Sequence, residues 1–399
     1  MRGGDFIAQW VRRPEIRDLL ARISDIERQL ATARNDQQRS FRDGLNSAVG
    51  NLWTAVQNAA LGRSAQSELA AAVYSELTCQ GGGTESREVF RQQWMKAVRS
   101  EGLHELPELR AAAPLLNAVD NRPGTADTLP QLPVGSSLLH LRFTLDEAFI
   151  SRDDEAFYPI DNPVRKDPVF GLPVVSPAGW KGNLRWAAAK LWADAAGTPE
   201  FLAQERFRMA LLFGDETGEE SGDRLAGYLD GCHPEAAALY REMLRRHFNT
   251  SGGDALPHHA GRLEFFPTFF DRIGFEVINP HDRRRRAGTM PIYFESVPAG
   301  TQGWFTLVYV PFDLVGRPPA EIKATLEGDL PLLARTLTEM FCVYGFSAKK
   351  TSGFGVAKCG PNTAQGQWQV GRMTACVTDL AGLPGLADIL VDRLEETLA

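Results

Sequence analysis

Hydrophobic side chains recur every three or four positions from residue 5 to about residue 116, with charged and amide side chains between them. The spacing is clearest at Leu19, Leu20, Ile23, Ile26 and Leu30. Such a period predicts amphipathic helices. A glycine-rich break at residues 80–86 ends one helical block, and another short helix is expected at Glu85–Ser100. No catalytic pattern occurs in residues 1–118, so we interpret them as a helical interaction domain.

The pattern changes after residues 119–137, a stretch rich in proline and glycine that we interpret as a linker. Leu139, Leu141, Phe143 and Leu145 then alternate with other side chains, as one face of a β-strand does. Further strands are predicted at "GRLEFFPTFF", "IGFEVI", "PIYFESV" and "GWFTLVYVPF", and a short strand-like run at "GFGVAKC". Helices are predicted at about 178–195 and about 319–342.

Helices alternating with strands in this way indicate an α+β fold. We expect an RRM/ferredoxin-like core with an antiparallel sheet over residues 138–375, joined to the N-terminal all-helical region. Residues at about 195–260 read as a helical insertion in that core, and residues 376–399 as a C-terminal tail.

Composition narrows the function classes. A membrane span needs about eighteen consecutive apolar residues, and the chain has no run of that length. The first residues also lack an apolar signal region, so we expect a cytoplasmic protein without membrane contact. The 5 cysteines are scattered without a Cys-x-x-Cys pair, so neither a disulfide framework nor a zinc knuckle is expected. The net charge of −7 opposes general coating of nucleic acid but leaves room for a local basic groove.

Basic residues do gather locally, in "HDRRRRAG" (281–288) and "SAKKTSGFG" (347–355). The first is compatible with a solvated charge run, and the second with an ordinary tight turn. Yet glycine, an aromatic ring and cations together suit a groove that follows an RNA backbone, in which bases stack and phosphates are neutralised. In the second stretch the candidate RNA-binding residues are Lys349, Lys350, Gly353, Phe354 and Gly355.

The start of the helix at about residue 178 is a third candidate. Its free N–H groups and partial positive charge favour bound phosphate. Gly179 and Gly182 would allow close approach of a backbone, while Lys181 and Arg185 add cations one turn apart. The alternative is a capped amphipathic helix with Trp180, Leu184 and Trp186 in the core. Other chemistry finds no support, because the chain has no phosphate-loop motif and no nucleophile elbow, and His258–His259 fit a surface loop better than a metal site.

Several motifs occur together in a characteristic order. They are "PIDNPVRKDPVFGLPVVSPAGWKGNLR", "LLFGDE", "GRLEF", "FEVINPHDRRRRAGTMPIYFESVPAGTQGWFTL" and "KKTSGFGVAK". In this order they resemble the RAMP-superfamily backbone subunit of type III CRISPR effector complexes, over residues 136 to 360. The resemblance implies an antiviral-defence protein that binds CRISPR guide RNA, pairs it with target single-stranded RNA, and assembles with other effector subunits and with copies of itself.

The resemblance also implies an endoribonuclease. The family's catalytic aspartate falls on Asp161, which could hold a divalent cation, Mg²⁺, or orient a 2′-hydroxyl for attack on the neighbouring phosphate. The alternative for Asp161 is an Asx-type turn ahead of Pro163. Lys181 matches the family's helix-start lysine, Gly353–Gly355 its glycine-rich loop, and Arg283 the arginine of its Ile-Asp-Arg motif, whereas Arg284 to Arg286 are additional.

Departures from the family pattern keep other roles open. "PAGW" stands where the family has Gly-Ser-Ser-Leu, and "EAFYP" replaces the usual Gly-Gly before the catalytic segment. One alternative is therefore a non-catalytic structural or capping subunit of the same complex. Another is a stand-alone endoribonuclease that processes guide precursors.

Overall fold

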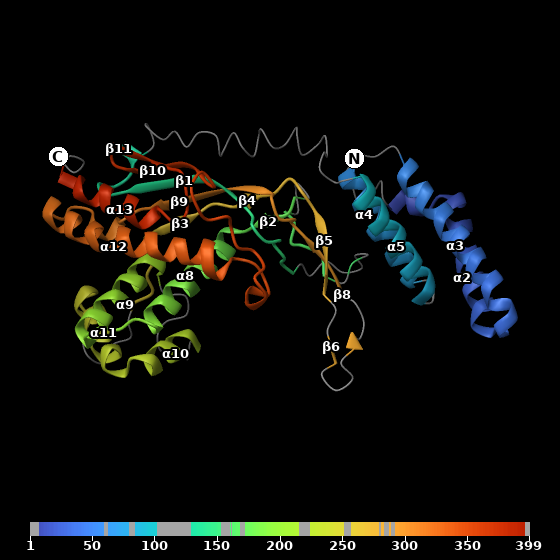
Figure 1. The fold of residues 1–399 in the computed structure, drawn as a ribbon, viewed down its shortest axis with the longest axis horizontal. Coiled ribbons are helices and arrows are strands. Elements are labelled where there is room, and N and C mark those ends of the chain that lie inside the picture. Colours follow the sequence, from blue (N-terminus) through green and yellow to red (C-terminus); the bar gives the residue numbers. More distant parts are fainter. Residues whose placement is uncertain are drawn as a thin grey trace. The chain divides into compact units, whose positions relative to one another are not determined.

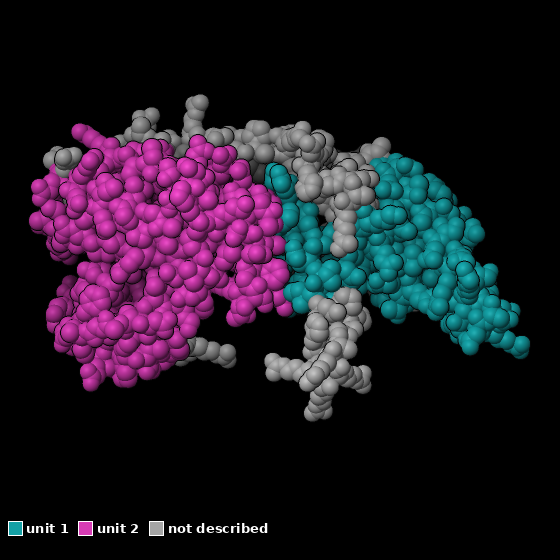
Figure 2. Space-filling model, in the orientation of Figure 1, with its two compact units in different colours: residues 1–116, 150–173, 271–298 teal, residues 117–149, 174–270, 299–399 magenta. Residues whose placement is uncertain are grey.

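A computed structural model describes most of the chain and divides it into two compact units (Figure 2). Unit 1 is formed by residues 1–116, 150–173 and 271–298, and unit 2 by residues 117–149, 174–270 and 299–399. The described residues are 8–59, 63–79, 84–101, 129–152, 160, 162–167, 172–214, 224–250, 257–278, 281–282, 287–288 and 292–395.

The N-terminal part of unit 1 is helical, as its period predicts. Its labelled helices are α2 (Pro14–Thr32), α3 (Asn35–Asn58), α4 (Arg63–Cys79) and α5 (Thr84–Glu101). Leu20 and Ile23 are fully buried, and Trp53 packs edge-on against Phe90 and Trp94 with ring centroids 5.7 and 5.8 Å apart. The buried carboxylate of Glu27 accepts a hydrogen bond from the backbone N–H of Ser86, near the start of α5.

The remainder of unit 1 is built on an antiparallel pair of strands. Strand β5 (Gly274–Ile278) pairs with β8 (Ile292–Ser296), and the short β6 (His281–Asp282) pairs with β7 (Ala287–Gly288) between them. The "RRRR" tract, residues 283–286, lies outside the described residues.

Unit 2 contains a five-stranded antiparallel sheet with the order β11-β10-β1-β9-β3. Its strands are β1 (Ser137–Thr144), β3 (Leu263–Phe265), β9 (Gln302–Tyr309), β10 (Gln365–Val370) and β11 (Met373–Val377). With α8 (Pro177–Ala193) after β1 and α12 (Pro319–Glu339) after β9, the first pass through the sheet is β-α-β-β-α-β. This is the expected ferredoxin-like core, extended by β11 at one edge.

Helices α8, α12 and α13 (Leu383–Asp392) lie on one face of this sheet (Figure 1). Alternate residues of β1 and β9 point into that interface, so Leu141, Phe143 and Phe305 are completely buried. Phe143 contacts Trp180 of α8, and the Trp180 indole donates to the Thr268 hydroxyl at 3.0 Å, which satisfies its buried N–H.

The remaining labelled elements of unit 2 are short strands and the helices between α8 and β3. A short ladder joins β2 (Val174–Val175) to β4 (Thr268–Phe269). These helices are α9 (Pro199–Phe213), α10 (Arg224–Cys232) and α11 (Pro234–His247).

Two details differ from the sequence predictions. The run "GFGVAKC" is not a strand, because only Ala357 makes a single bridge, to Leu145, and the sheet strand is β10, further along the chain. Cys342 and Cys359 form a disulfide with Cα atoms 5.8 Å apart, whereas the scattered cysteines had suggested no disulfide framework. The pair carries no spacing signature, so only the fold reveals it.

Candidate nucleic-acid interface

Helix α8 starts with a cap built from its own sequence. The Ser176 hydroxyl accepts a hydrogen bond from the backbone N–H of Gly179 at 3.1 Å, and Pro177 occupies the first turn, where a missing N–H costs little. Trp180 and Leu184 are fully buried and fix one side of the helix. Lys181 is half-buried and makes no hydrogen bond or ion pair with any residue that the structure describes.

The glycine-rich loop, residues 345–358, follows the π-helical end of α12 at Met340–Tyr344. Gly345 and Gly355 both have φ of 73°, and a Cβ on Gly355 would lie 2.2 Å from the Cβ of Ser347. These glycines are therefore required by the loop's own packing. Gly353, with φ of 87°, has open space where its Cβ would be, so a ligand backbone could approach it.

Asn183 connects α8 to this loop. Its side-chain amide donates to the carbonyl of Gly179 at 2.8 Å and to the carbonyl of Phe346 at 3.1 Å. A second contact is made by Lys350, whose ammonium lies 4.4 Å from the ring centroid of Trp186. The first turns of α8 and the glycine-rich loop thus form one surface, far apart in sequence but adjacent in the fold.

Lys350 and Trp186 have roles that the sequence did not reveal. Trp186, considered above as a core residue, is only half-buried and stacks edge-on against Tyr344 at 5.0 Å. Burial of the Lys350 ammonium lowers its pKa, although the lysine starts from an ordinary value far above neutrality. Lys350 therefore keeps its positive charge near neutral pH, and its contact with Trp186 holds the loop against α8.

In unit 1, the chain after residue 161 is bound to β8. Ile160 is buried, and the backbone N–H of Glu295 donates to the carbonyl of Asn162 at 2.9 Å. The buried Glu295 carboxylate accepts hydrogen bonds from the backbone N–H of Val164 and from the ammonium of Lys166.

A family model described as the RAMP superfamily matches residues 81–358, well over half of the 399-residue chain. The chain belongs to the RAMP superfamily. No curated protein sequence matches this RAMP protein.

Solved structures with a similar arrangement share little sequence with it. A type III-B Cmr-beta structure, described as bound to cognate target RNA, is 14% identical with a TM-score of 0.39, covering 84% of this chain and 99% of that one. Csc2 from Thermofilum pendens is 14% identical, with a TM-score of 0.30 and coverage of 68% and 80%. A chain described as part of a CRISPR RNA-guided surveillance complex is 12% identical, with a TM-score of 0.32 and coverage of 58% and 68%. Because these TM-scores are low, the family assignment rests on the family model.

The fold gathers some of the candidate residues and not others. Lys181 and Arg185 lie on α8, and Lys349, Lys350, Gly353, Phe354 and Gly355 lie on the glycine-rich loop, all in unit 2 of this RAMP protein. Asp161 and Arg283 lie outside the described residues. Their described neighbours, Asn162 and Asp282, both belong to unit 1.

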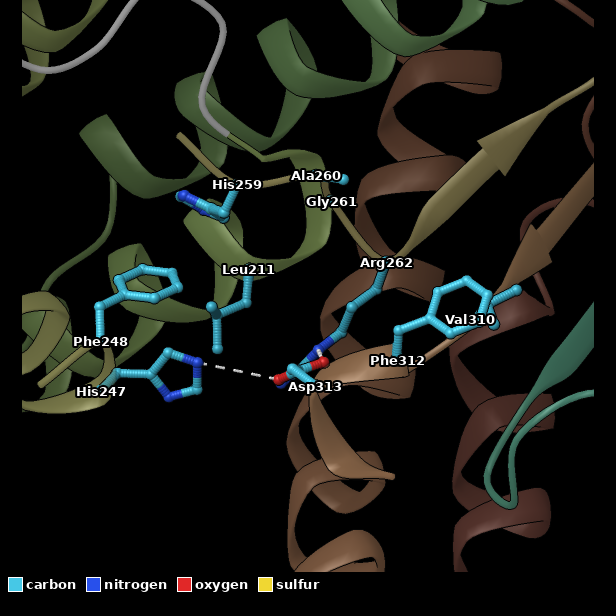
Figure 3. A pocket seen from close by; sticks show the side chains of 10 residues that line it. All are labelled: Leu211, His247, Phe248, His259, Ala260, Gly261, Arg262, Val310, Phe312 and Asp313. Carbon is cyan, nitrogen blue, oxygen red and sulfur yellow. Dashed lines mark hydrogen bonds and ion pairs between the residues drawn. The ribbon is translucent and has the colours of Figure 1, made fainter. Parts of the chain in front are cut away.

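Unit 2 also contains a small pocket with a volume of about 90 Å³, which includes no candidate residue (Figure 3). Arg262 is one of the residues that line it, and it donates from Nε to Asp313 at 2.9 Å and from Nη1 to the fully buried Asp329 at 2.6 Å. The Tyr309 hydroxyl also donates to Asp329, at 2.8 Å. The motif "GRLEF" contains Arg262, but its partners come from other elements of the fold and have no signal in the sequence.

Burial and neighbouring charges shift the pKa values of Asp329, Asp313 and His247 around this pocket. Burial raises the pKa of Asp329, while Arg262 and the Tyr309 hydroxyl oppose that shift. Burial also disfavours the charged form of Asp313, but the hydrogen bonds and charge of Arg262 outweigh it and lower the Asp313 pKa. Burial lowers the pKa of His247, whose Nε2 lies 3.9 Å from Asp313.

Metal ligands are not assembled among the residues that the structure describes. These residues include no group of three or more His, Cys, Asp or Glu side chains that could hold an ion. His258 is exposed, while His259 places Nε2 3.1 Å from the Ala210 carbonyl. Within the same described part of the chain, no helix is both long and apolar enough to cross a membrane.

Proposed function

We propose that this RAMP protein is a guide-RNA-binding backbone subunit of a type III CRISPR effector complex. We further propose that it cleaves guide-paired target RNA, with Asp161 as the catalytic residue. The main support is the surface formed by α8 and the glycine-rich loop, joined by the two hydrogen bonds of Asn183. Family membership and the motif order support the same role.

The α8 surface has the chemistry that an RNA backbone requires. Lys181 is free to meet a phosphate, and the half-buried Arg185 lies one turn further along the same helix. Gly353 leaves space for close approach, and the half-buried Phe354 offers a ring edge or face to a base. These contacts address phosphates and ring faces, so guide binding would be independent of sequence.

Cleavage at Asp161 would be a transesterification within the target strand. The carboxylate takes the proton of a 2′-hydroxyl as its oxygen attacks the adjacent phosphorus. The bond from phosphorus to the 5′-oxygen breaks, and that oxygen leaves with a proton from solvent. The products are a 2′,3′-cyclic phosphate and a 5′-hydroxyl, so no external oxidant or cofactor atom is consumed.

The family resemblance leads us to expect Mg²⁺ as the divalent cation of this cleavage. The Glu295 carboxylate, which binds the segment that follows Asp161 in the sequence, is already paired with Lys166, and the described residues include no group of three carboxylate, thiol or imidazole ligands. Whether cleavage needs a divalent cation is tested by adding excess EDTA to the assembled complex. We expect cleavage to stop and guide RNA to stay bound, and Mg²⁺ to restore cleavage.

The deciding experiment uses the complex assembled with guide and labelled target RNA. Asp161→Ala should abolish the cuts while target binding is retained, and Asp271→Ala, an exposed carboxylate of the same unit, should cut normally. Unchanged cutting by Asp161→Ala would leave a structural or capping role. Cutting of guide precursors by the isolated protein, without partner subunits, would instead favour a stand-alone processing enzyme.

A further inference from the structure

Glu295 holds the chain that follows Asp161 in a defined position. Its side chain is only 1% exposed, yet it carries a carboxylate rather than an apolar group. One oxygen, Oε2, accepts from the Val164 backbone N–H at 3.2 Å and from the Lys166 ammonium at 2.6 Å. A single buried group on β8 thus holds two residues of the same segment.

Asn162, the residue directly after Asp161, is held by the same strand. Its carbonyl accepts the Glu295 backbone N–H at 2.9 Å, and its side-chain amide lies 3.4 Å from the Tyr293 carbonyl. Ile160, on the other side of Asp161, is 1% exposed. The described residues on both sides of Asp161 are therefore fixed by burial or by hydrogen bonds to β8.

A buried ion pair is a costly way to attach a segment to a strand. Two apolar side chains of similar volume would serve stability as well or better, because burying charges carries a large desolvation penalty. The ion pair instead fixes the orientation of the segment, because one carboxylate oxygen accepts hydrogen bonds from both a backbone N–H and an ammonium.

We propose that Glu295, with Lys166, is a positioning residue for target cleavage. It holds residues 162–166, the segment that follows Asp161 in the sequence, on β8, and cleavage depends on that attachment. This inference rests on the catalytic role proposed for Asp161. A small displacement of a catalytic group costs about 100-fold in rate, even when the change lies outside the chemistry itself.

The test compares Glu295→Gln, Lys166→Met and the double variant in the assembled complex. Glu295→Gln keeps the shape and an oxygen acceptor for Val164 but loses the charge that binds Lys166. We expect single-turnover cleavage to be about 10- to 100-fold slower, with guide content and target affinity unchanged. Cleavage at the wild-type rate would overturn the proposal.

The double variant separates positioning from simple stability. It removes both charges of this ion pair together, so its melting temperature should recover toward the wild-type value and it should fold even where a single variant does not. Cleavage should nevertheless stay slow, because the directional contact is still missing. Recovery of cleavage together with the melting temperature would show a merely structural role and overturn the proposal.

Asp161→Ala is measured beside these variants. Its complete loss of cleavage, next to normal cleavage by Glu295→Gln, would sink the positioning role alone. Wild-type cleavage by Asp161→Ala would instead contradict the proposed function from which the positioning role starts.

Discussion

Asn183 in α8 donates a hydrogen bond to the backbone carbonyl of Phe346, 163 residues further along the chain, at 3.1 Å. The same amide donates to Gly179 in its own helix. These bonds connect the helix start to the glycine-rich loop. The start of α8 and the glycine-rich loop are therefore both held by the Asn183 side chain. Replacing Asn183 should loosen the loop without changing the cations of the candidate interface.

Asn183→Ala should weaken guide binding without removing any charge. Each lost hydrogen bond costs about 1 kcal/mol, and a buried carbonyl left without a donor costs more. We expect faster hydrogen exchange in residues 345–358 and lower affinity for guide RNA, with an unchanged salt dependence of binding. The salt dependence would contradict this account if it fell as it does when a phosphate-binding cation is lost.

Lys181→Ala, unlike Asn183→Ala, should change the salt dependence of guide binding. If the free Lys181 ammonium meets a phosphate, its removal lowers the slope of log affinity against log salt by about 0.7 for a single strand. Affinity should fall similarly for guides of different sequence. Arg372→Ala, which removes an exposed cation from the turn between β10 and β11, is the matched control and should leave the slope unaltered.

Features of the fold that depend on neighbouring residues can be predicted from the sequence, whereas contacts between residues far apart in the chain cannot. Leu139, Leu141 and Phe143 predict β1 because the alternation of apolar and other side chains is visible within a few residues, and all three are buried as predicted. Strand β10 was missed because only two of its six residues, Trp368 and Val370, are large and apolar, which is too short a run to show alternation.

The cations proposed for the candidate site can be named from the sequence, but the contacts that hold them in place cannot. Lys181 and the glycine-rich loop are visible as short motifs, whereas the Asn183 contact with Phe346 exists only once the fold is made. The contact between Glu295 and Lys166 spans 129 residues and has no local pattern at either end. Gly355 looked like a ligand-facing glycine, but Ser347 explains it by packing.

The Cys342–Cys359 disulfide should stabilise the glycine-rich loop that it closes. The cysteines are 17 residues apart, and closing a loop of that size contributes about 3 kcal/mol by chain entropy. Replacing both cysteines with serine should lower the melting temperature and speed hydrogen exchange in residues 345–358. Cys376→Ser, which removes an exposed free thiol, is the control and should change neither.

A reducing agent provides the second arm of that experiment. Dithiothreitol should shift the wild-type protein toward the behaviour of the double serine variant and leave the variant itself unchanged. An equal response of both proteins would show that the bond between Cys342 and Cys359 is not what the reagent acts on.

Arg262→Met should be among the most destabilising substitutions in unit 2. It leaves Asp329 fully buried without its ion-pair partner, a change that typically costs about 3–5 kcal/mol. Adding Asp329→Asn should recover part of that loss, because no charge is then buried alone. Urea unfolding measures both, with Arg28→Ala as a control, since its exposed pair with Asp25 should contribute about 0.5 kcal/mol or less.

Stability should fall as the pH drops below about 6.5, because of His247. Burial lowers the pKa of His247 in the folded protein, so the unfolded chain binds a proton more readily. Its contribution is therefore complete above the unfolded pKa and is lost as the pH falls toward the folded one. His247→Gln should reduce the drop in melting temperature between pH 7.5 and pH 5.5 while leaving the drop at more acidic pH, to which the lowered pKa of Asp313 contributes. Equal drops in variant and wild type would assign the acid sensitivity to other groups.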